Sequence, residues 1–451
     1  MLAALSLPWL GLAGLGGLPA IVLGKSPARE ANDNLRLLAA VWCFGLTFNY
    51  ALLLLFSQLP QVSVASDLLA IVLGLAALWR CRGRFARPER LRPWLIGFVV
   101  LLSAIIAILL DPLEDWDARS IWFFHAKMIF YGGGLSQNIG LDTPGVPSPA
   151  YPMLVPGLAA QVASLVGFWN EYLPKLSLAL LLPVPILTVL MLRRTPVCMT
   201  LLILAYWFIL KQLFYNGSMD GYLALYAAAA VFFLADWLEG GGDAAFLAVI
   251  GALGVASGIK VEGQVVYLAI GLALVILLAS RRLVPPRPSA AALMLSPLPF
   301  VGYVIWHVLV VRWSLALDDF SLAHAWPRLR DPEALWLMIR FILLHPRFYG
   351  PALGLLAVIL IARRRGVAMP TAAQLPLLAG IIYVVGVFMI FLMTPHDLFW
   401  HLNTASGRVM RSATQMLVIA GILIVRDLER AGRCPFFGFL ARPDAASGRY
   451  G

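Results

Sequence analysis

The sequence predicts an all-α polytopic membrane protein. Hydrophobic residues make up 61% of the 451 residues and charged residues only 13%, with a mean hydropathy of +0.85. A soluble domain carries about 25% charged residues. Uninterrupted apolar runs recur along the chain, each near the roughly 20 residues that a helix needs to cross the hydrocarbon layer. Helices are favoured for these runs because each satisfies its backbone polar groups internally.

Positively charged loops set the predicted orientation. Short loops rich in Arg and Lys face the cytoplasm, and the densest of them spans residues 80–92, with six arginines between two apolar runs. With that loop inside, the other arginine clusters fall on the same side if the chain has about 13 spans, its N-terminus outside and its C-terminus inside. We therefore predict a bacterial inner-membrane protein. These loops also account for the net charge of +11, so no nucleic-acid partner is expected.

Three apolar segments need separate interpretation. The first run, Leu5–Leu23, lacks a preceding basic stretch and is expected to be a retained span, not a cleaved signal peptide. Counting Tyr151–Gly167 as a full span would move Arg193 and Arg194 to the outside, so we predict a re-entrant or interfacial helix on the outer face. Pro332–His345 is also short and is predicted to be an amphipathic helix along the outer interface.

The first long outer loop is rich in carboxylates. Asp111, Glu114, Asp115 and Asp117 directly follow an apolar run. A carboxylate beside a low-dielectric wall has a raised proton affinity and can act as a general base. Neighbouring carboxylates could instead share a divalent cation such as Mg²⁺ or Mn²⁺. The alternative is a solvated acidic loop at a helix N-terminus. A helix from residue 118 would put Asp117 on one face with His125.

Charged residues also interrupt two later apolar stretches. Asp220 stands between two long apolar runs, where it either caps the next helix or joins the acidic loop on the same membrane face. Lys260 and Glu262 break another long stretch, and inserting each charge costs on the order of 3 kcal/mol near the membrane centre. They predict either a hairpin whose lysine extends to the interface or an anion-binding lysine near a reaction site.

The last predicted outer loop, at residues 394–411, is basic. Arg408 and Arg411 are three residues apart at the start of a span and share a helix face, and His401 precedes them. Cations on the outer side run against the positive-inside preference. Guanidinium groups bind phosphate through paired hydrogen bonds, so a phosphate at the membrane boundary explains them. Contact with lipid headgroups is the alternative.

In their order these motifs resemble the bacterial GT-C membrane glycosyltransferases, a group that includes aminoarabinose transferases, protein O-mannosyltransferases and rhizobial galacturonosyl transferases. The matching motifs are Trp116-Asp117-Ala118, Ala150-Tyr151-Pro152, Asp220, the Gly-Ile-Lys-Val-Glu-Gly turn at 258–263, and the stretch from Trp400 to Arg408. The resemblance implies a GT-C-like catalytic membrane module at 93–427. An N-terminal three-helix addition at 1–92 would precede it, and a short basic cytoplasmic tail at 428–451 would follow.

The resemblance implies an inverting transfer of a sugar from a polyprenyl-phosphate donor to an envelope lipid or glycan on the periplasmic face. It makes Asp117 the general base, with Asp115 as the next candidate and Asp220 as a further acid. A divalent cation, if the enzyme needs one, would bind to Asp117 and Asp220. The implied ligands of the donor phosphate are Lys260, Arg408, Arg411 and His401. Residues implied to contact the acceptor or support the site are Glu114, His125, Lys127, Tyr151 and Glu262.

One departure from the group bears on the substrate. Aminoarabinose transferases have a Glu-Lys pair just before the proline that follows the first loop, where this chain has Ala150-Tyr151, which argues against aminoarabinose as the sugar. Two other functions stay open: a transporter or flippase for a lipid-linked sugar, and an O-antigen polymerase or ligase. The first should show an internal repeat, which we do not find in the sequence, and the second would not need Asp117.

Overall fold

The computed structural model describes residues 2–24, 32–82, 91–206, 216–316 and 320–433. Within these ranges the fold is all-helical, and the only extended pairing is an isolated bridge between Gln58 and Gly134. The all-α fold class is therefore confirmed. Eight helical segments in the described ranges are long and apolar enough to cross a membrane. The finer count of about 13 spans stays a prediction.

The helices follow one another along the chain in three groups. The first group comprises α1 (Leu2–Leu15), α2 (Leu18–Leu23), α3 (Asp33–Phe56), α4 (Leu59–Cys81), α5 (Leu91–Leu110), η1 (Ala118–Trp122), α6 (Phe123–Tyr131), η2 (Gln137–Ile139) and α7 (Leu154–Val166). The second comprises η3 (Leu173–Lys175), α8 (Leu176–Ala179), α9 (Pro183–Met191), α10 (Pro196–Ala205), α11 (Met219–Asp236), η6 (Trp237–Gly241), α12 (Gly242–Ile259) and α13 (Gly263–Ala279). The third comprises α14 (Ala290–Leu295), η7 (Leu298–Phe300), α15 (Val301–Arg312), α16 (Leu322–Leu329), α17 (Pro332–Met338), η8 (Ile339–Leu343), α18 (Pro346–Arg364), α19 (Thr371–Met393), α20 (Leu398–His401), η9 (Leu402–Ser406), α21 (Gly407–Val409) and α22 (Arg411–Arg430).

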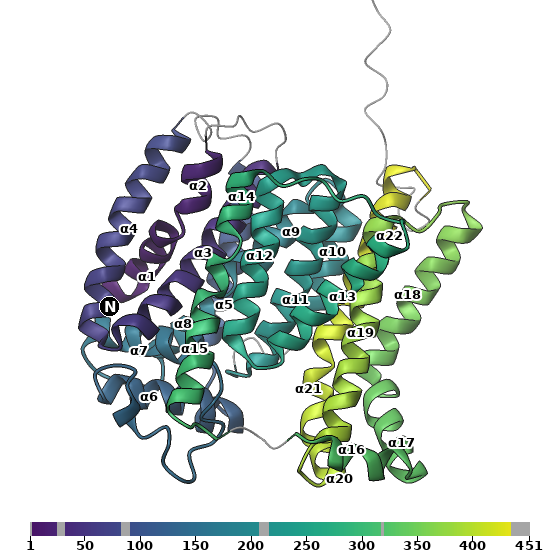
Figure 1. The fold of residues 1–451 in the computed structure, drawn as a ribbon. Helices are drawn as coiled ribbons and strands as arrows, with labels where there is room; N and C mark the ends of the chain where they lie inside the picture. Colours follow the sequence, from purple (N-terminus) through teal and green to yellow (C-terminus); the bar gives the residue numbers. More distant parts are fainter. Residues whose placement is uncertain (1, 25–31, 83–90, 207–215, 317–319, 434–451) are drawn as a thin grey trace, which may run out of the picture.

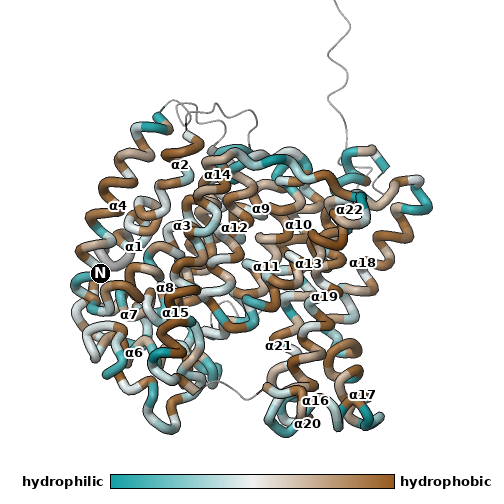
Figure 2. The backbone as a smooth tube through the Cα atoms, in the orientation of Figure 1, coloured by the Kyte–Doolittle hydropathy of each residue, from teal (hydrophilic) through white to brown (hydrophobic). Residues whose placement is uncertain are grey.

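The two ends of the bundle differ in composition. Helices α2, α4 and α18 end and α14 begins at one end of the bundle, whereas α6, α7, α16, α17 and α20 lie at the other (Figure 1). The first end carries Arg80, Arg363 and Arg364 in the last turns of α4 and α18, and we call it the arginine-rich end. The second is called the loop end. Figure 2 shows mostly apolar residues in the middle of the bundle and hydrophilic residues at both ends.

Two arginine clusters of the predicted topology cannot be placed. Residues 83–90 and the tail at 434–451 lie outside the described residues. At the loop end, Arg328 lies in the last turn of α16 and Arg347 in the first turn of α18, so arginines stand at helix ends on both sides of the bundle. Which end faces the cytoplasm stays a prediction.

Burial separates core helices from peripheral ones. The segment Leu398–Arg430, which includes α22, is 89% buried in its most apolar window, whereas α4 and α18 are each only 11% buried. The exposed side chains of α4 are nonetheless apolar, among them Leu68, Leu75 and Leu78. Packing within the chain leaves the apolar side chains of such a helix uncovered. Hydrocarbon around the helix would keep them out of water.

The longest candidate segment, Met219–Ile259, is two helices joined by a turn. Gly240, with φ 99°, breaks the helix, and α11 and α12 pack against each other. Helix α12 also packs on α3, where a Cβ at Gly251 would lie 2.5 Å from the Cys43 Cβ. Small residues permit such close approach between membrane helices, so α3, α11 and α12 form a tight central layer.

The two segments that were predicted not to span are short helices at the loop end. Helix α7 has 13 residues and is buried along most of its length, packed against α3 and α6. Helix α17 and the π-helical turn η8 occupy most of Pro332–His345. Neither segment is among those long enough to span. Helix α7 is enclosed by its neighbours, which fits the re-entrant form of the prediction better than the interfacial form.

A buried ion pair joins α3 to α11. Arg36 donates from Nε and Nη2 to the two carboxylate oxygens of Asp236, both at 2.7 Å, and its Nη1 lies 2.7 Å from Asp33. The side chains of Arg36 and Asp236 are 7% and 12% exposed. Removing one partner of a buried pair costs about 3–5 kcal/mol because the other charge stays buried and unpaired. This pair therefore fixes the register between the two helices.

We expect Arg36→Ala to lower the thermal unfolding temperature of the detergent-solubilised protein by far more than Arg312→Ala, which removes an exposed arginine. The double variant Arg36→Met with Asp236→Leu should recover much of the loss, because it leaves no buried charge. Fluorescence-detected size-exclusion after heating measures all three variants. Equal losses in Arg36→Ala and Arg312→Ala would show that the pair contributes nothing to stability.

Candidate functional site

The acidic loop between α5 and η1 is held in a defined conformation. Asp115 Oδ1 accepts a hydrogen bond of 2.9 Å from the Asp117 backbone N–H, which turns the chain into η1. The loop packs against the turn before α11, where Gly217 has φ +82°. A Cβ at Gly217 would lie 2.7 Å from the Ala118 Cβ. Only glycine allows this approach, and it brings the start of α11 against the acids.

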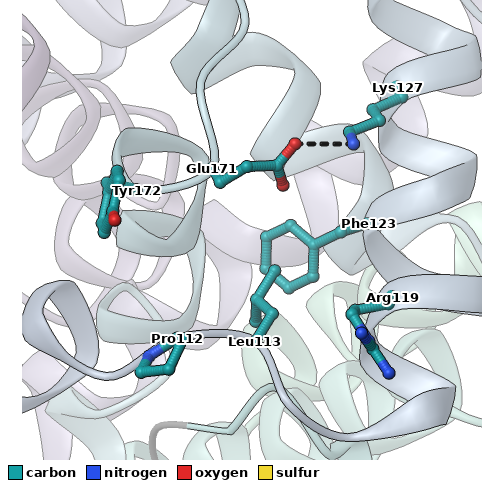
Figure 3. Close-up of a pocket in the computed structure, with 7 residues that line it drawn as sticks. All are labelled: Pro112, Leu113, Arg119, Phe123, Lys127, Glu171 and Tyr172. Atoms are coloured by element: carbon teal, nitrogen blue, oxygen red, sulfur yellow. Dashed lines mark ion pairs between the residues drawn. The ribbon is translucent and has the colours of Figure 1, made fainter.

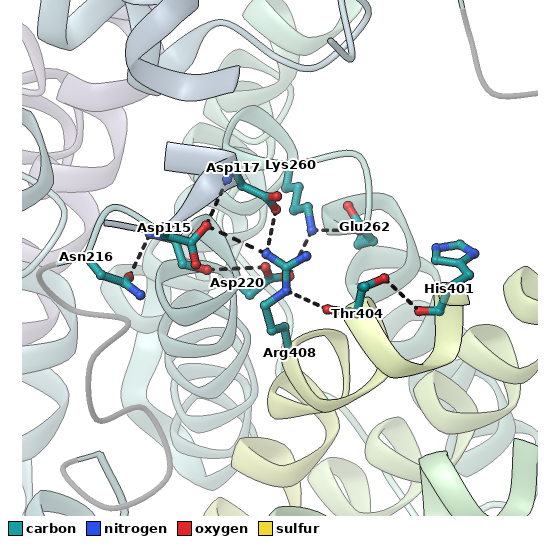
Figure 4. Close-up of polar contacts among 10 residues, drawn as sticks. Asp115, Asp117, Asn216, Asp220, Lys260, Glu262, His401, Thr404 and Arg408 are labelled. Atoms are coloured by element: carbon teal, nitrogen blue, oxygen red, sulfur yellow. Dashed lines mark hydrogen bonds and ion pairs between the residues drawn. The ribbon is translucent and has the colours of Figure 1, made fainter. Parts of the chain in front are cut away.

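Arg408 joins the last loop to the first. Its Nη1 lies 2.6 Å from Asp117 Oδ2 and 3.9 Å from Asp115 Oδ1, across 291 residues of sequence in the first case (Figure 4). Its Nε donates to the Thr404 carbonyl at 3.2 Å, which orients the guanidinium plane. The π-helical turn η9, just before Arg408, sets the direction in which α21 presents this side chain. Asp117 and Arg408, which the sequence predicts on the same membrane face, are thus in direct contact in the structure.

Lys260 forms a second ionic centre next to the first. It ends α12 in an extended conformation, and its Nζ lies 2.8 Å from Asp220 Oδ1 and 2.9 Å from Glu262 Oε1. The side chains of Lys260 and Asp220 are 6% and 3% exposed. Asp220 also accepts from the Ser218 hydroxyl at 3.4 Å. Lys260 therefore does not extend to the interface as an isolated charge, which was the alternative from sequence; it neutralises two acids inside the bundle.

The two centres act on each other electrostatically. The charge of Arg408 interacts with that of Asp220 as well as with those of Asp117 and Asp115. In the loop, burial and then the neighbouring Asp117 charge raise the pKa of Asp115, while Arg408 opposes that rise. A carboxyl group with a raised pKa is a stronger proton acceptor when ionised. Asp115 therefore has the electrostatic setting expected of a general base.

A further cationic group lies beside Arg408. Arg411 is buried, 5% exposed, and its Nε lies 3.3 Å from the Gly407 carbonyl oxygen. His345, at the start of α18, approaches Gly407, since a Cβ there would lie 3.1 Å from its Nε2. Burial, and then the charges of Arg347 and Arg411, lower the pKa of His345. Arg408, Arg411 and Arg347 thus concentrate positive charge at the loop end.

Arg347 and Tyr383 belong to this region but were not predicted as site residues. Arg347 follows Pro332–His345 on a predicted outer loop, where an arginine runs against the positive-inside preference, and that signal could have identified it. The Tyr383 hydroxyl donates to the Val409 carbonyl at 3.3 Å, from the middle of the apolar α19. Nothing in the local sequence distinguishes that tyrosine from a core residue.

The other predicted residues are spread more widely. His401 Nδ1 lies 2.8 Å from the Thr394 hydroxyl, and the His401 charge also interacts with Lys260 and Arg408. The Tyr151 ring stacks on Trp122 at 5.3 Å, and its hydroxyl interacts electrostatically with Lys260. Both residues therefore border the ionic centres.

Three predicted residues lie outside these contacts. Lys127 pairs with Glu171 at 2.6 Å. His125 is fully buried, and its Nε2 donates to the Pro147 carbonyl at 3.1 Å. Glu114 is exposed. Among the interactions of the described residues, none joins these three to Asp117, so their predicted roles at the site stay predictions.

The acids of the site are poorly arranged for a metal. In the part of the chain that the structure describes, no three His, Cys, Asp or Glu side chains are grouped so as to hold a metal ion. Asp117 and Asp220, the predicted ligands, each bind a cationic side chain, Arg408 and Lys260. Because these oxygens are already neutralised by protein cations, we derive no chemical step through a metal.

Comparison with known proteins does not assign this chain to a family. No family model matches the chain, and no curated protein or solved structure is significantly similar to it. The function must therefore be argued from the site.

His125 makes a pH-dependent contribution to stability that can be measured. Burial lowers its pKa from 6.5 to about 4, so the neutral ring is favoured in the folded chain. Its stabilising contribution is fully present above pH 6.5 and is lost as the pH falls toward about 4. We expect His125→Asn, which keeps a donor for Pro147, to show a smaller loss of unfolding temperature between about pH 7 and about pH 4.5 than the wild type.

The control for this prediction is His307→Asn, which replaces an exposed histidine and should leave the pH dependence unchanged. Thermal unfolding followed by intrinsic fluorescence measures both. If His125→Asn and the wild type lose stability in parallel, another group is responsible for the acid sensitivity.

Proposed function

We propose that this chain is an inverting membrane glycosyltransferase of the GT-C type. It would move a sugar from a polyprenyl-phosphate donor to an envelope lipid or glycan. The observation that carries the proposal is the contact between the Asp115/Asp117 carboxylates and Arg408, with the Lys260–Asp220 pair beside it. A carboxylate that can accept a proton and cations that can hold a phosphate are the two chemical parts that this reaction needs.

The surroundings of the cluster support a lipid-linked donor. Apolar helices with exposed hydrocarbon-facing surfaces surround the bundle, and the cluster lies toward one of its ends. A polyprenyl chain would lie in the hydrocarbon while its phosphate reaches the boundary. The arginine-rich end is the opposite end of the bundle. By the positive-inside preference it faces the cytoplasm, so we propose that the site faces the periplasm of an inner membrane.

The proposed reaction balances within the donor and acceptor. The acceptor oxygen attacks the anomeric carbon of the donor sugar, and the bond from that carbon to the phosphate oxygen breaks. The polyprenyl phosphate leaves with the bonding electrons, and the acceptor proton goes to a carboxylate of the acidic loop. One displacement inverts the configuration at the anomeric carbon. Negative charge grows on the leaving phosphate, where Arg408, Arg411 and Lys260 would stabilise it.

The ion pair between Arg408 and Asp117 gives donor binding a second effect. The Arg408 Nη1 donates to Asp117 Oδ2 at 2.6 Å, so that oxygen is not available to an acceptor hydroxyl. A donor phosphate competes for the same guanidinium, since arginine binds phosphate through paired charged hydrogen bonds. Donor binding would therefore free Asp117 as the proton acceptor. Asp115, with its raised pKa, would be the second acceptor in the same loop.

The first test replaces the acid. In a deletion strain, the wild-type gene should restore a glycosylated envelope product that mass spectrometry detects. Asp117→Asn should lower its formation by about 10²–10⁴-fold, the usual contribution of a general base. Asp142→Asn, an exposed acid on the same loop region, should restore it fully. A transporter, or a ligase that relies on arginine and histidine, should keep most of its activity in Asp117→Asn, and that result would refute the proposal.

The second test replaces the cation. Arg408→Ala should weaken binding of undecaprenyl phosphate to the detergent-solubilised protein by about 10-fold or more, because a charged hydrogen bond contributes about 1.5–3 kcal/mol. Arg408→Lys should recover part of the affinity, since lysine keeps the charge but not the paired donors. Arg330→Ala removes an arginine that lies over Trp326 and is the matched control. Unchanged affinity in Arg408→Ala would exclude a phosphate contact.

A further inference from the structure

A pocket of about 350 Å³ lies beside the acidic loop, which contributes Pro112 and Leu113 to its lining (Figure 3). Its apolar walls are Pro112, Leu113, the ring of Phe123 and the ring of Tyr172. Three charged side chains, Arg119, Lys127 and Glu171, complete the lining. Ligand sites commonly have this size and this composition, with mostly apolar and aromatic walls and a few polar groups.

The pocket and the ionic centres share one segment of chain. Pro112 and Leu113 precede Asp115 and Asp117 in the loop, and Arg119 follows them at the start of η1. Leu113 also touches the start of α11, where a Cβ at Gly217 would lie 2.9 Å from its Cδ2. The residues on either side of the proposed proton acceptors in the sequence therefore line the pocket.

Two contacts join the segments that line the pocket. The Lys175 side chain is fully buried and donates from Nζ to the Asp111 carbonyl at the start of the loop. Lys127 lies 2.6 Å from Glu171 and sits over the Trp169 ring at 5.7 Å from its centre. These contacts hold the start of the acidic loop and the segment at residues 169–175 against α6.

The charge of the pocket is biased toward binding an anion. Glu171 is the one acid among the lining residues, and it forms an ion pair with Lys127. In the part of the chain that the structure describes, Arg119 forms no ion pair and no side-chain hydrogen bond, and it lines the pocket. A guanidinium in this position offers paired donors to a phosphate or a carboxylate. The ring of Tyr172, which is 58% exposed, offers a flat apolar face on which the C–H face of a sugar can rest, whereas Phe123 is only 2% exposed.

We infer that this pocket is the acceptor site and that it takes an anionic sugar, with Arg119 holding its phosphate or carboxylate group. The inference rests on the proposed function, because it assigns the acceptor of that same reaction. It places the acceptor against the segment that carries the acids, and the donor phosphate at Arg408. The acceptor hydroxyl would then reach Asp115 or Asp117 from the pocket, while Arg408 holds the donor.

Binding of sugar probes to the full-length protein in detergent tests this inference. Glucose 6-phosphate and glucuronate are the anionic probes, and glucose and inorganic phosphate are the two reference compounds, all measured by isothermal titration. We expect at least one anionic sugar to bind more tightly than both references. Arg119→Gln should weaken that binding by about 10-fold or more, and Arg119→Lys should recover part of it. Arg330→Gln should have no effect.

Three outcomes would overturn the inference. One is that no anionic sugar binds more tightly than glucose. Another is equal binding of inorganic phosphate and the anionic sugars, which would indicate a simple anion site. The third is unchanged binding in Arg119→Gln. These outcomes are separable from failure of the proposed function, because Asp117→Asn is judged by product formation alone. If Asp117→Asn abolishes the product while Arg119→Gln binds normally, the glycosyltransferase proposal stands and only the acceptor assignment fails.

Discussion

The pairing of Arg408 with Asp117 is the interaction on which the arrangement at the loop end depends. Both groups are charged and mostly withdrawn from water, with side chains 26% and 17% exposed. A charge in such surroundings is strongly unfavourable unless it is paired. The acidic loop before η1 and the short helix α21 must therefore come together, although they are almost 300 residues apart. The Lys260 centre applies the same constraint to α11 and α12.

Helix α11 shows how these constraints combine. It is buried throughout and carries an acid at each end, Asp220 at the loop end and Asp236 at the other. Each acid pairs with a cation from a different helix, Lys260 after α12 and Arg36 in α3. Its 18 residues extend about 27 Å at 1.5 Å per residue, close to the thickness of the hydrocarbon layer. The helix is thus fixed at both ends, and the ionic site is built on an element that cannot slide.

Much of this could be predicted from the sequence, for reasons that differ between residues. Composition and the length of the apolar runs were enough to predict the all-α membrane fold, because a run of about 20 apolar residues crosses a bilayer as a helix. The meeting of Asp117 with Arg408 was predictable because both are charges that topology places on one face. The pairing of Lys260 with Asp220 was not predicted as a contact, since the choice of partner depends on how helices pack. Arg119 and Tyr172 gave no signal, because the pocket they line is created by folding of the loop.

Two π-helical turns at the site, η1 and η9, set the directions in which its charged side chains point. The π-helical turn η1 follows Asp117 directly, and η9 directly precedes the helix that carries Arg408. Such turns arise formally from one extra residue in an α-helix and are frequent at functional sites. If the same residues formed a regular α-helix in place of η9, Arg408 would be rotated by about 100° relative to the helix before it. The bundle could persist while its arginine turned away from the acid, so the ionic site depends on this one turn being π-helical and not α-helical.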